Sequence, residues 1–343
     1  MSITITRDLR SLSRDELSNW LSSHREPAYR LNQLWHALHA RGITDWKGLT
    51  NLPLNLRQAL ADSFSMTPAV LQKILCASDG TTKLLLRYPD GATVECVRLL
   101  HDDHVTACLS TQVGCRMGCR FCRTAQIMFR RNLAAHEIEE QFHLLGKTLS
   151  EKPRNIVFMG MGEPLDNFVE TVNAARLLGD PRGVDVGFRR ITVSTAGIIP
   201  QIIQLADEEP RLKLALSLTS PFQKQRETLM PIACRYPLPE LIEVIRYHIK
   251  RTGRRTTIEY ILLSGINDTM EHAGEILRLT TNLSCKINLI SFNPVAGLDF
   301  IAPTPEAAEQ FLGWLRAGKN AVMLRQSLGA EVQAACGQLA GEF

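Results

Sequence analysis

Three cysteines stand close together in the stretch LSTQVGCRMGCRFCRTAQ, residues 109–126. Cys115, Cys119 and Cys122 follow the spacing C-x3-C-x2-C, which brings three thiolates within reach of one inorganic centre. A structural zinc site is closed by four ligands, and no second CxxC or HxxxH pair in the sequence supplies a fourth. An iron–sulfur cluster on three cysteines leaves one iron open to bind a small molecule and pass it an electron. The spacing therefore favours such a cluster, with zinc as the alternative.

The rest of the composition is typical of a globular cytoplasmic enzyme. Of the 343 residues, 45% are hydrophobic and 22% are charged. The first 20 residues lack an apolar signal core, and no run of about 18 uncharged apolar residues occurs, so we expect neither export nor a membrane span. Nine cysteines, an odd number, do not suggest a secreted disulfide framework. In a reducing compartment, cysteines that lie close together in the sequence more often bind a metal or take part in redox chemistry.

Positive charge gathers around the cysteine cluster. Five arginines fall within sixteen residues and no Asp or Glu interrupts them, while the net charge of the chain is only +4; they are Arg116, Arg120, Arg123, Arg130 and Arg131. A solvated surface usually mixes its signs. These five arginines indicate a phosphate-rich substrate. The alternative is that they only form a solvent-exposed surface without a ligand.

The chain divides into three predicted parts. Residues 1–70 are expected to form a small helical accessory domain, with a capping pattern at Ser13 to Glu16. Its tryptophans, Trp20, Trp35 and Trp46, could stack on bases, but their spacing is more typical of a small core. Residues 71–104 read as a bridging hairpin around Pro89-Asp90-Gly91. Residues 105–343 are expected to form the main α/β domain, including a C-terminal segment that carries Cys336.

The main domain repeats a strand–helix pattern. Six short β-branched or apolar runs alternate with helical periodicity, which predicts a parallel sheet: VTACLS, NIVFMG, RRITVST, KLALSLT, TTIEYILL and KINLISF. Six such units fit an α/β fold of the partial (βα)6 barrel type, with a doubly wound sheet as the alternative. In both, ligands gather at the carboxyl ends of the strands. The cysteine loop follows the first strand directly.

Two motifs resemble a known enzyme superfamily. GCRMGCRFC is similar to the signature of radical-SAM enzymes, whose open iron binds the amino and carboxylate groups of S-adenosylmethionine (SAM). FMGMGEPLDN, residues 158–167, resembles the glycine-rich loop that contacts the methionine amino group in that superfamily. The resemblance implies that Gly162 and Glu163 bind SAM in a partial radical-SAM barrel.

Further motifs resemble the RlmN/Cfr family of radical-SAM RNA methyltransferases: ACLSTQVGC, TAQIMFRRNL, GMGEP, ISFNP and AACGQLAG. The resemblance covers nearly the whole chain, including YRLNQLWHAL near the N-terminus. It implies one 4Fe-4S cluster, two SAM molecules per turnover and an electron donor such as a flavodoxin. It also implies an RNA substrate, with an adenosine in a single-stranded loop or bulge of ribosomal or transfer RNA.

The same resemblance gives roles to three further residues. It implies that Cys336 is methylated by one SAM and that a radical from the second SAM takes a hydrogen atom from this methyl group. The resulting carbon radical adds to adenine, Cys108 releases the adduct by forming a disulfide, and Glu95 removes the ring proton. For each residue a plain structural role, as a buried thiol or a hairpin carboxylate, is the alternative.

The remaining SAM contacts implied by the resemblance follow later strands: Ser194, Ser217, Thr219 and Asn293. The chain departs from the family where Thr219 replaces a usual histidine. Gln326 and Leu328 likewise stand where relatives carry basic residues. These departures put the RNA target in doubt more than the chemistry, and the sequence does not separate methylation of carbon 2 from carbon 8.

Two rival hypotheses stay open at this stage. The first is a radical-SAM enzyme that acts on a peptide or a small metabolite. The second is a non-catalytic RNA-binding protein with a structural zinc ion.

Overall fold

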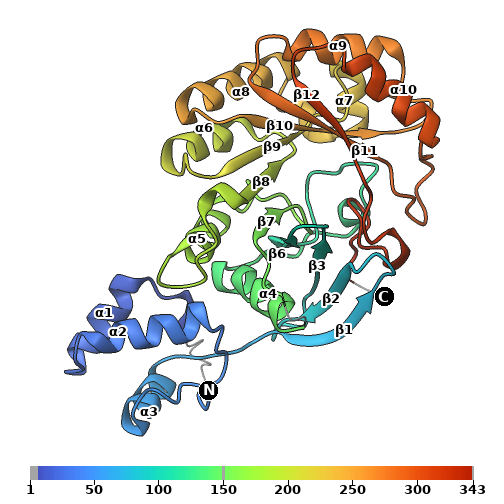
Figure 1. Cartoon of the computed structure of the whole chain (residues 1–343). Coiled ribbons are helices and arrows are strands. Elements are labelled where there is room, and N and C mark those ends of the chain that lie inside the picture. The colour runs from blue at the N-terminus through green and yellow to red at the C-terminus, as the bar shows by residue number, and fades with distance from the viewer. Residues whose placement is uncertain (1–6, 149–150, 342–343) are drawn as a thin grey trace.

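Figure 1 shows the computed structural model, which describes residues 7–148 and 151–341. Within these residues ten strands form one curved sheet in the order β1-β2-β3-β4-β7-β8-β9-β10-β11-β12. The sheet from β4 onward is parallel. These strands are β4 (Val105–Cys108), β7 (Asn155–Phe158), β8 (Ile191–Thr195), β9 (Lys213–Ser217), β10 (Thr256–Leu262), β11 (Cys285–Ser291) and β12 (Ala321–Arg325). The six predicted strands are confirmed, and β12 adds a further parallel strand.

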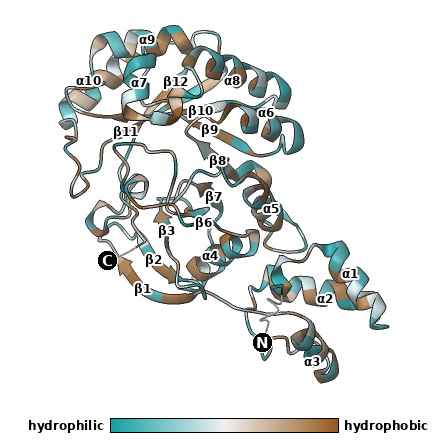
Figure 2. Cartoon of the chain, turned by 180° about the vertical axis from the view of Figure 1, so that it is seen from behind, coloured by the Kyte–Doolittle hydropathy of each residue, from teal (hydrophilic) through white to brown (hydrophobic). Residues whose placement is uncertain are grey.

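Helices connect the parallel strands and cover one side of the sheet (Figure 1). They are α4 (Ala135–Thr148), α5 (Phe168–Gly179), α6 (Ile199–Glu208), α7 (Gln223–Leu229), α8 (Leu238–Thr252), α9 (Met270–Thr280) and α10 (Pro305–Leu315). In α8, Leu238, Leu241, Ile242 and Ile245 are buried, which is the spacing of one apolar helix face. Figure 2 shows brown and teal stretches alternating along these helices. The predicted α/β partial barrel is therefore confirmed.

Short helical turns lie in the connections. They are η3 (Arg123–Gln126), η4 (Phe188–Arg190), η5 (Pro231–Cys234) and η6 (Ala330–Val332).

No helix within residues 7–148 or 151–341 is long and apolar enough to span a lipid bilayer.

Three antiparallel strands extend the sheet beyond β4. They are β1 (Val70–Cys76), β2 (Thr82–Arg87) and β3 (Thr93–Leu100), and β3 pairs with β4. The turn between β2 and β3 is the predicted one, with Gly91 at φ 78° and the Ala92 N–H donating to Asp90 Oδ1 at 3.0 Å. The bridging hairpin is thus continuous with the main sheet.

The N-terminal residues form a separate helical lobe (Figure 1). It contains η1 (Leu9–Ser11), α1 (Arg14–Ser23), α2 (Tyr29–Trp35), a π-helical turn η2 (His36–Ala40) and α3 (Leu54–Ser63). The predicted capping box between Ser13 and Glu16 is present. Trp35 is buried in this lobe and Trp20 and Trp46 pack against its core, as the core interpretation expected. The boundaries at residues 70 and 104 stay a prediction.

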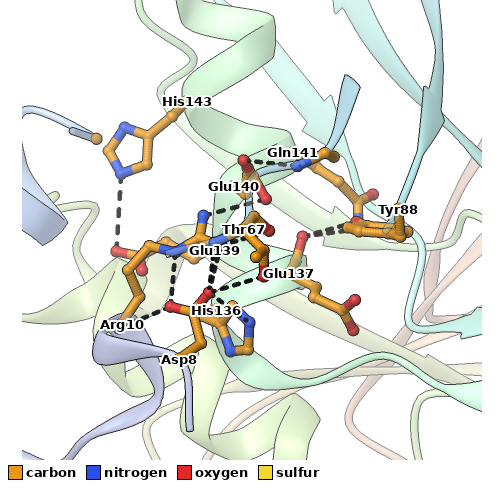
Figure 3. A network of polar contacts seen from close by, with 12 residues as sticks. Asp8, Arg10, Thr67, Tyr88, His136, Glu137, Glu139, Glu140, Gln141 and His143 are labelled. Carbon is orange, nitrogen blue, oxygen red and sulfur yellow. Dashed lines mark hydrogen bonds and ion pairs between the residues drawn. The ribbon is translucent and has the colours of Figure 1, made fainter. Parts of the chain in front are cut away.

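The lobe contacts helix α4 through buried polar groups (Figure 3). Arg10 forms ion pairs with Asp8 at 2.9 Å and with Glu140 of α4 at 3.2 Å, and all three side chains are less than a tenth exposed. His39 contacts Glu139 at 2.8 Å. Burial alone would raise the pKa of Glu139, but His39 and His143 outweigh it and lower this pKa to about 2. Buried ion pairs therefore contribute to the interface between the lobe and the barrel.

Replacing Arg10 with methionine is expected to lower the free energy of unfolding of the lobe by about 3–5 kcal/mol, because Asp8 and Glu140 would stay buried without a cation. Urea titration followed by tryptophan fluorescence measures this. The control Arg7→Met removes a largely exposed ion pair with Glu16 and should cost less than about 1 kcal/mol. Equal losses for both variants would contradict this account of the interface.

Candidate active site

The predicted metal ligands lie on a loop that connects β4 with α4. The short strands β5 (Gln112–Val113) and β6 (Arg131–Asn132) pair antiparallel and close the base of this loop. Gly114 has φ 78°, and a Cβ atom there would lie 2.6 Å from the carbonyl oxygen of Met128. Only glycine fits such a contact. The sequence therefore folds residues 114–130 into a closed loop at the end of the first parallel strand.

Cys115, Cys119 and Cys122 are free, partly buried thiols that line one cavity. Burial raises the pKa of Cys115 to about 12, and burial together with the two neighbouring thiols raises the pKa of Cys119 well above its usual value. A bound cationic centre reverses this preference because it stabilises thiolates. Among residues 7–148 and 151–341, no group of three His, Cys, Asp or Glu side chains is arranged to hold a single metal ion. Three thiols that line one cavity are the type of donor that holds an iron–sulfur cluster.

The cavity beside these thiols encloses about 950 Å³ of space when its open mouth is included. Its walls come from the carboxyl ends of β7, β8, β9 and β10. Of the predicted SAM contacts, the cavity is lined by Gly162, Glu163, Ser194, Ser217 and Thr219. Residues predicted from separate motifs thus meet at one edge of the sheet.

The Gly162-Glu163 turn ties two strand ends together. Gly162 has φ 101°, and a Cβ atom there would lie 2.6 Å from the side chain of Gln112. The Glu163 carboxylate accepts hydrogen bonds from the N–H of Leu165 at 3.1 Å and of Ala196, after β8, at 2.8 Å. Burial raises the pKa of Glu163 to about 7. Its side chain therefore holds the cavity wall in place.

Thr219, the residue that departs from the family pattern, has an unusual backbone. Its φ is 59°, in the left-handed region that a β-branched residue adopts at a cost of about 1–3 kcal/mol. The Nδ2 group of Asn267 donates to the Thr219 carbonyl oxygen at 2.7 Å and to that of Ile261 at 2.8 Å. The surrounding structure therefore imposes this conformation on a residue that lines the cavity.

Cys336 lies where two cavities meet. It lines the cavity of the three thiols and also a second cavity, of about 510 Å³ when its open mouth is included, which Cys108, Asn293 and Arg325 line as well. Asn293 was predicted to contact SAM; it lines only the second of these cavities, and its Nδ2 group donates to the Cys336 carbonyl oxygen at 3.4 Å. The two cysteines that the sequence singled out are therefore brought together.

Electrostatics couple these two thiols to one cation. Burial and the nearby Cys336 raise the pKa of Cys108 to about 12. The charge of Cys336, in turn, raises the pKa of Arg325 at the end of β12, and Glu259 and Cys108 add to this effect. The Arg325 guanidinium thus lies within Coulombic reach of both cysteines and can stabilise a thiolate there.

Backbone and side-chain hydrogen bonds dock the C-terminal segment, residues 334–341, onto the cluster loop. The Arg123 N–H donates to the Gly337 carbonyl oxygen at 2.7 Å, and the Thr124 hydroxyl donates to that of Leu339 at 2.7 Å. In Figure 1 this red segment crosses back to the antiparallel part of the sheet. These contacts hold Cys336 beside the cluster cysteines.

Glu95 on β3 is completely buried and lines neither of these two cavities. Its Oε1 atom pairs with Lys83 Nζ at 2.8 Å, and its Oε2 atom accepts from the N–H groups of Ala340 at 2.7 Å and Gly341 at 3.2 Å. Of the three predicted catalytic residues, Glu95 is the one that is not brought into a cavity with the others.

Two charged residues of the site were not predicted. Glu259 on β10 lines the cavity of the three thiols, and the buried Arg226 on α7 lies against its wall. A carboxylate inside the apolar run TTIEYILL is a signal that could have identified Glu259. Arg226 gave no such signal, since it stands in the polar stretch QKQRETL.

Comparison with known proteins identifies relatives over almost the entire length. A model of the radical SAM superfamily matches residues 109–279, and a model described as the N-terminal domain of the ribosomal RNA large subunit methyltransferase matches residues 7–66. The probable dual-specificity RNA methyltransferase RlmN of Moorella thermoacetica is 43% identical, with 98% of each chain covered. That of Geobacillus kaustophilus is 41% identical over 96% of this chain and 91% of its own.

A solved structure matches equally widely. The crystal structure of a radical SAM methyltransferase from Sphaerobacter thermophilus superimposes with a TM-score of 0.93 at 38% identity, covering 98% of this chain and 100% of that chain. Sequence and fold therefore agree on the same relatives.

Proposed function

Because the chain belongs to the RlmN family of radical-SAM RNA methyltransferases, we propose that it methylates a ring carbon of an adenine in RNA, with Cys336 as carrier of the methyl group. The observation that carries this proposal is the position of Cys336. It lines both the cavity of the three thiols and the cavity of Cys108, so one side chain can exchange a group between the two.

The cofactors fit the first cavity. Cys115, Cys119 and Cys122 would hold a 4Fe-4S cluster, and the wall from Gly162 to Thr219 would hold SAM. When bound, the reduced cluster and SAM supply a carbon-centred radical that can take a hydrogen atom from a nearby methyl group. An external electron donor such as a flavodoxin would reduce the cluster. Each turnover would then need one SAM to methylate Cys336, and a second SAM with one electron to form the radical.

The methyl group reaches RNA in two transfers through Cys336. In the first, the Cys336 sulfur would attack the methyl carbon of one SAM, and S-adenosylhomocysteine would leave; the Arg325 guanidinium lies within Coulombic reach of this sulfur. In the second, the activated methyl carbon adds to adenine. The adduct would then lose the ring proton to a base and one electron to the oxidised cluster. Cys108 would attack the Cys336 sulfur and form a disulfide, the bond between that sulfur and the transferred carbon would break, and this carbon would take up a proton to become the methyl group of the released base. A reducing compartment such as the cytoplasm would reopen this disulfide.

A general-base role for Glu95 needs movement of the C-terminal segment. Because Ala340 and Gly341 occupy one carboxylate oxygen, that oxygen can accept a proton from adenine only after these residues withdraw. Cys336 stands four residues before Ala340 on the same segment. If RNA displaced the segment, the same movement would shift Cys336 and would release the Glu95 carboxylate from its hydrogen bonds with Ala340 and Gly341.

The RNA would approach through a third, larger cleft of about 1670 Å³. Arg190, Lys213 and Lys286 line it, and the pKa of Lys213 is lowered by burial and by the neighbouring charges of Lys286, Arg254 and Arg190. Met159 and Arg325 line this cleft and the Cys336 cavity alike. Unpaired bases could reach Cys336 while the cations bind phosphates.

The proposal is tested by incubating the anaerobically reconstituted protein with reductant, total RNA and SAM that carries a labelled methyl group. We expect label in methyladenine. Nuclease digestion followed by liquid chromatography against synthetic standards, with mass detection, separates the 2-methyl from the 8-methyl isomer. Label on Cys336 with none in RNA would point to another substrate. Bound zinc without iron would instead contradict radical chemistry.

Replacing Cys108 with alanine is expected to trap RNA on the protein, because no thiol remains to attack the Cys336 sulfur. Denaturing gels should show a covalent protein–RNA species and at least a roughly 100-fold loss of released product. Cys96→Ala, a buried cysteine on the adjacent β3, is the matched control and should release product normally. If the Cys108→Ala variant released methylated RNA at the wild-type rate, Cys108 would be excluded as the resolving thiol.

A further inference from the structure

Arg226 on α7 is completely buried, yet only neutral groups accept its hydrogen bonds. Its Nη2 group donates to the carbonyl oxygen of Ala196 at 2.6 Å, and its Nε group donates to that of Leu218 at 3.2 Å. The Nη1 atom is buried and has no hydrogen-bond partner. Across residues 7–148 and 151–341, no carboxylate forms an ion pair with this guanidinium. The cation is therefore uncompensated by the protein's acidic side chains.

Such a cation is costly to bury. An unpaired charge in a protein interior costs several kcal/mol, whereas a neutral amide could satisfy the same carbonyl oxygens for less. Burial lowers the pKa of Arg226 to about 10, so the group still carries its charge at neutral pH. A full charge at this place is explained if an anion that is not a protein carboxylate stands next to it.

Arg226 lies behind the wall of the cavity of the three cysteines, because Ala196 and Ser217, whose carbonyl oxygens accept its hydrogen bonds, both line that cavity. A charge on Cys119 would raise the pKa of Arg226. The cluster loop also packs on the end of the same helix, where the Arg120 N–H donates to the carbonyl oxygen of Leu229 at 3.0 Å. Met230, the next residue, lines the cavity with the cysteines. Helix α7 therefore carries Arg226 and packs against the loop of the three cysteines at one wall of the cavity.

We propose that Arg226 is a positioning residue whose charge stabilises the reduced form of the thiolate-bound cluster. This inference rests on the proposed function, because it takes Cys115, Cys119 and Cys122 as ligands of an iron–sulfur cluster. Three thiolates give such a cluster negative charge, and uptake of one electron from an external reductant adds another. A fixed cation in a low-dielectric interior stabilises the added electron more than it would in water. Arg226 thus favours the reduction that must precede cleavage of SAM.

The guanidinium also fixes the cavity wall. It donates to the carbonyl oxygens of Ala196 and Ser217, which follow and end β8 and β9. Ala196 in turn donates its N–H to Glu163. A role in holding the wall alone would need hydrogen bonds but no charge, so the two roles can be separated by experiment.

The experiment is an equilibrium redox titration of the anaerobic full-length protein, with the cluster followed by visible absorbance and electron paramagnetic resonance. At the wild-type midpoint potential, we expect the ratio of reduced to oxidised cluster to fall at least tenfold in Arg226→Gln, which is about 59 mV for a one-electron couple. Arg226→Lys keeps the charge and should stay within about threefold of the wild type.

The control is Arg10→Met, which removes another buried arginine far from the cysteines and should leave the ratio unchanged. A wild-type protein without a cluster would refute the proposed function itself. If the wild-type protein holds a cluster and Arg226→Gln gives the same ratio of reduced to oxidised cluster, only the role of Arg226 is overturned. A tenfold fall in Arg226→Lys would also overturn it, and this variant decides the matter if Arg226→Gln does not fold.

Discussion

Replacing Cys336 with serine is expected to abolish RNA methylation, with a loss of at least about 10³-fold in rate, because a hydroxyl at this position is far too weak a nucleophile to take the methyl group from SAM. The cavity that we propose for the cluster and SAM is lined mainly by other residues. Iron content and the binding of SAM should therefore stay close to the wild-type values. The assay is transfer of labelled methyl from SAM to RNA, with iron measured on the same samples.

The matched control is Cys234→Ser, which makes the same chemical change at an exposed cysteine on η5. It should methylate RNA at the wild-type rate. If the Cys336→Ser variant transferred methyl at more than a few per cent of that rate, the methyl group would have to reach RNA without Cys336.

Replacing Cys119 with serine is expected to remove the iron and with it all reductive cleavage of SAM. Loss of one of three thiolate ligands leaves too few to hold the cluster, and we expect affinity for it to fall by more than about 100-fold. Iron analysis, visible absorbance and the yield of 5′-deoxyadenosine measure the effect. The control Cys285→Ser changes a buried cysteine of β11 outside the cavity. It should keep the wild-type iron content, visible absorbance and yield of 5′-deoxyadenosine. An iron-replete, active Cys119→Ser protein would contradict the assigned ligand set.

Much of the barrel could be predicted because its strands are short, apolar and separated by amphipathic helices. β1 was missed because it is a largely exposed edge strand, where Val70 and Ile74 face solvent and alternation is weak. β12 was missed because AVMLR is short and half-exposed. A local pattern of apolar residues in the sequence reveals strands that are buried, and these two edge strands are largely exposed.

The family predicted from the cysteine, GMGEP and AACGQLAG motifs is confirmed, as is the class of enzyme. Motif spacing could not predict contacts that depend on tertiary structure. Arg10, for example, reads as a surface arginine in sequence, yet it is buried between Asp8 and Glu140. Glu95 was predicted from its motif alone, and its contacts with Ala340 and Gly341 join positions nearly 250 residues apart.

The most direct test of the central claim follows one methyl group through Cys336. The protein is first methylated with deuterated SAM, freed of it by desalting, and then given RNA, reductant and unlabelled SAM for a single turnover. The account predicts that deuterium initially on Cys336 appears in the methyl group of adenine, as measured by mass spectrometry of the nucleosides. A product methyl without deuterium, while the label stays on Cys336, would contradict the account.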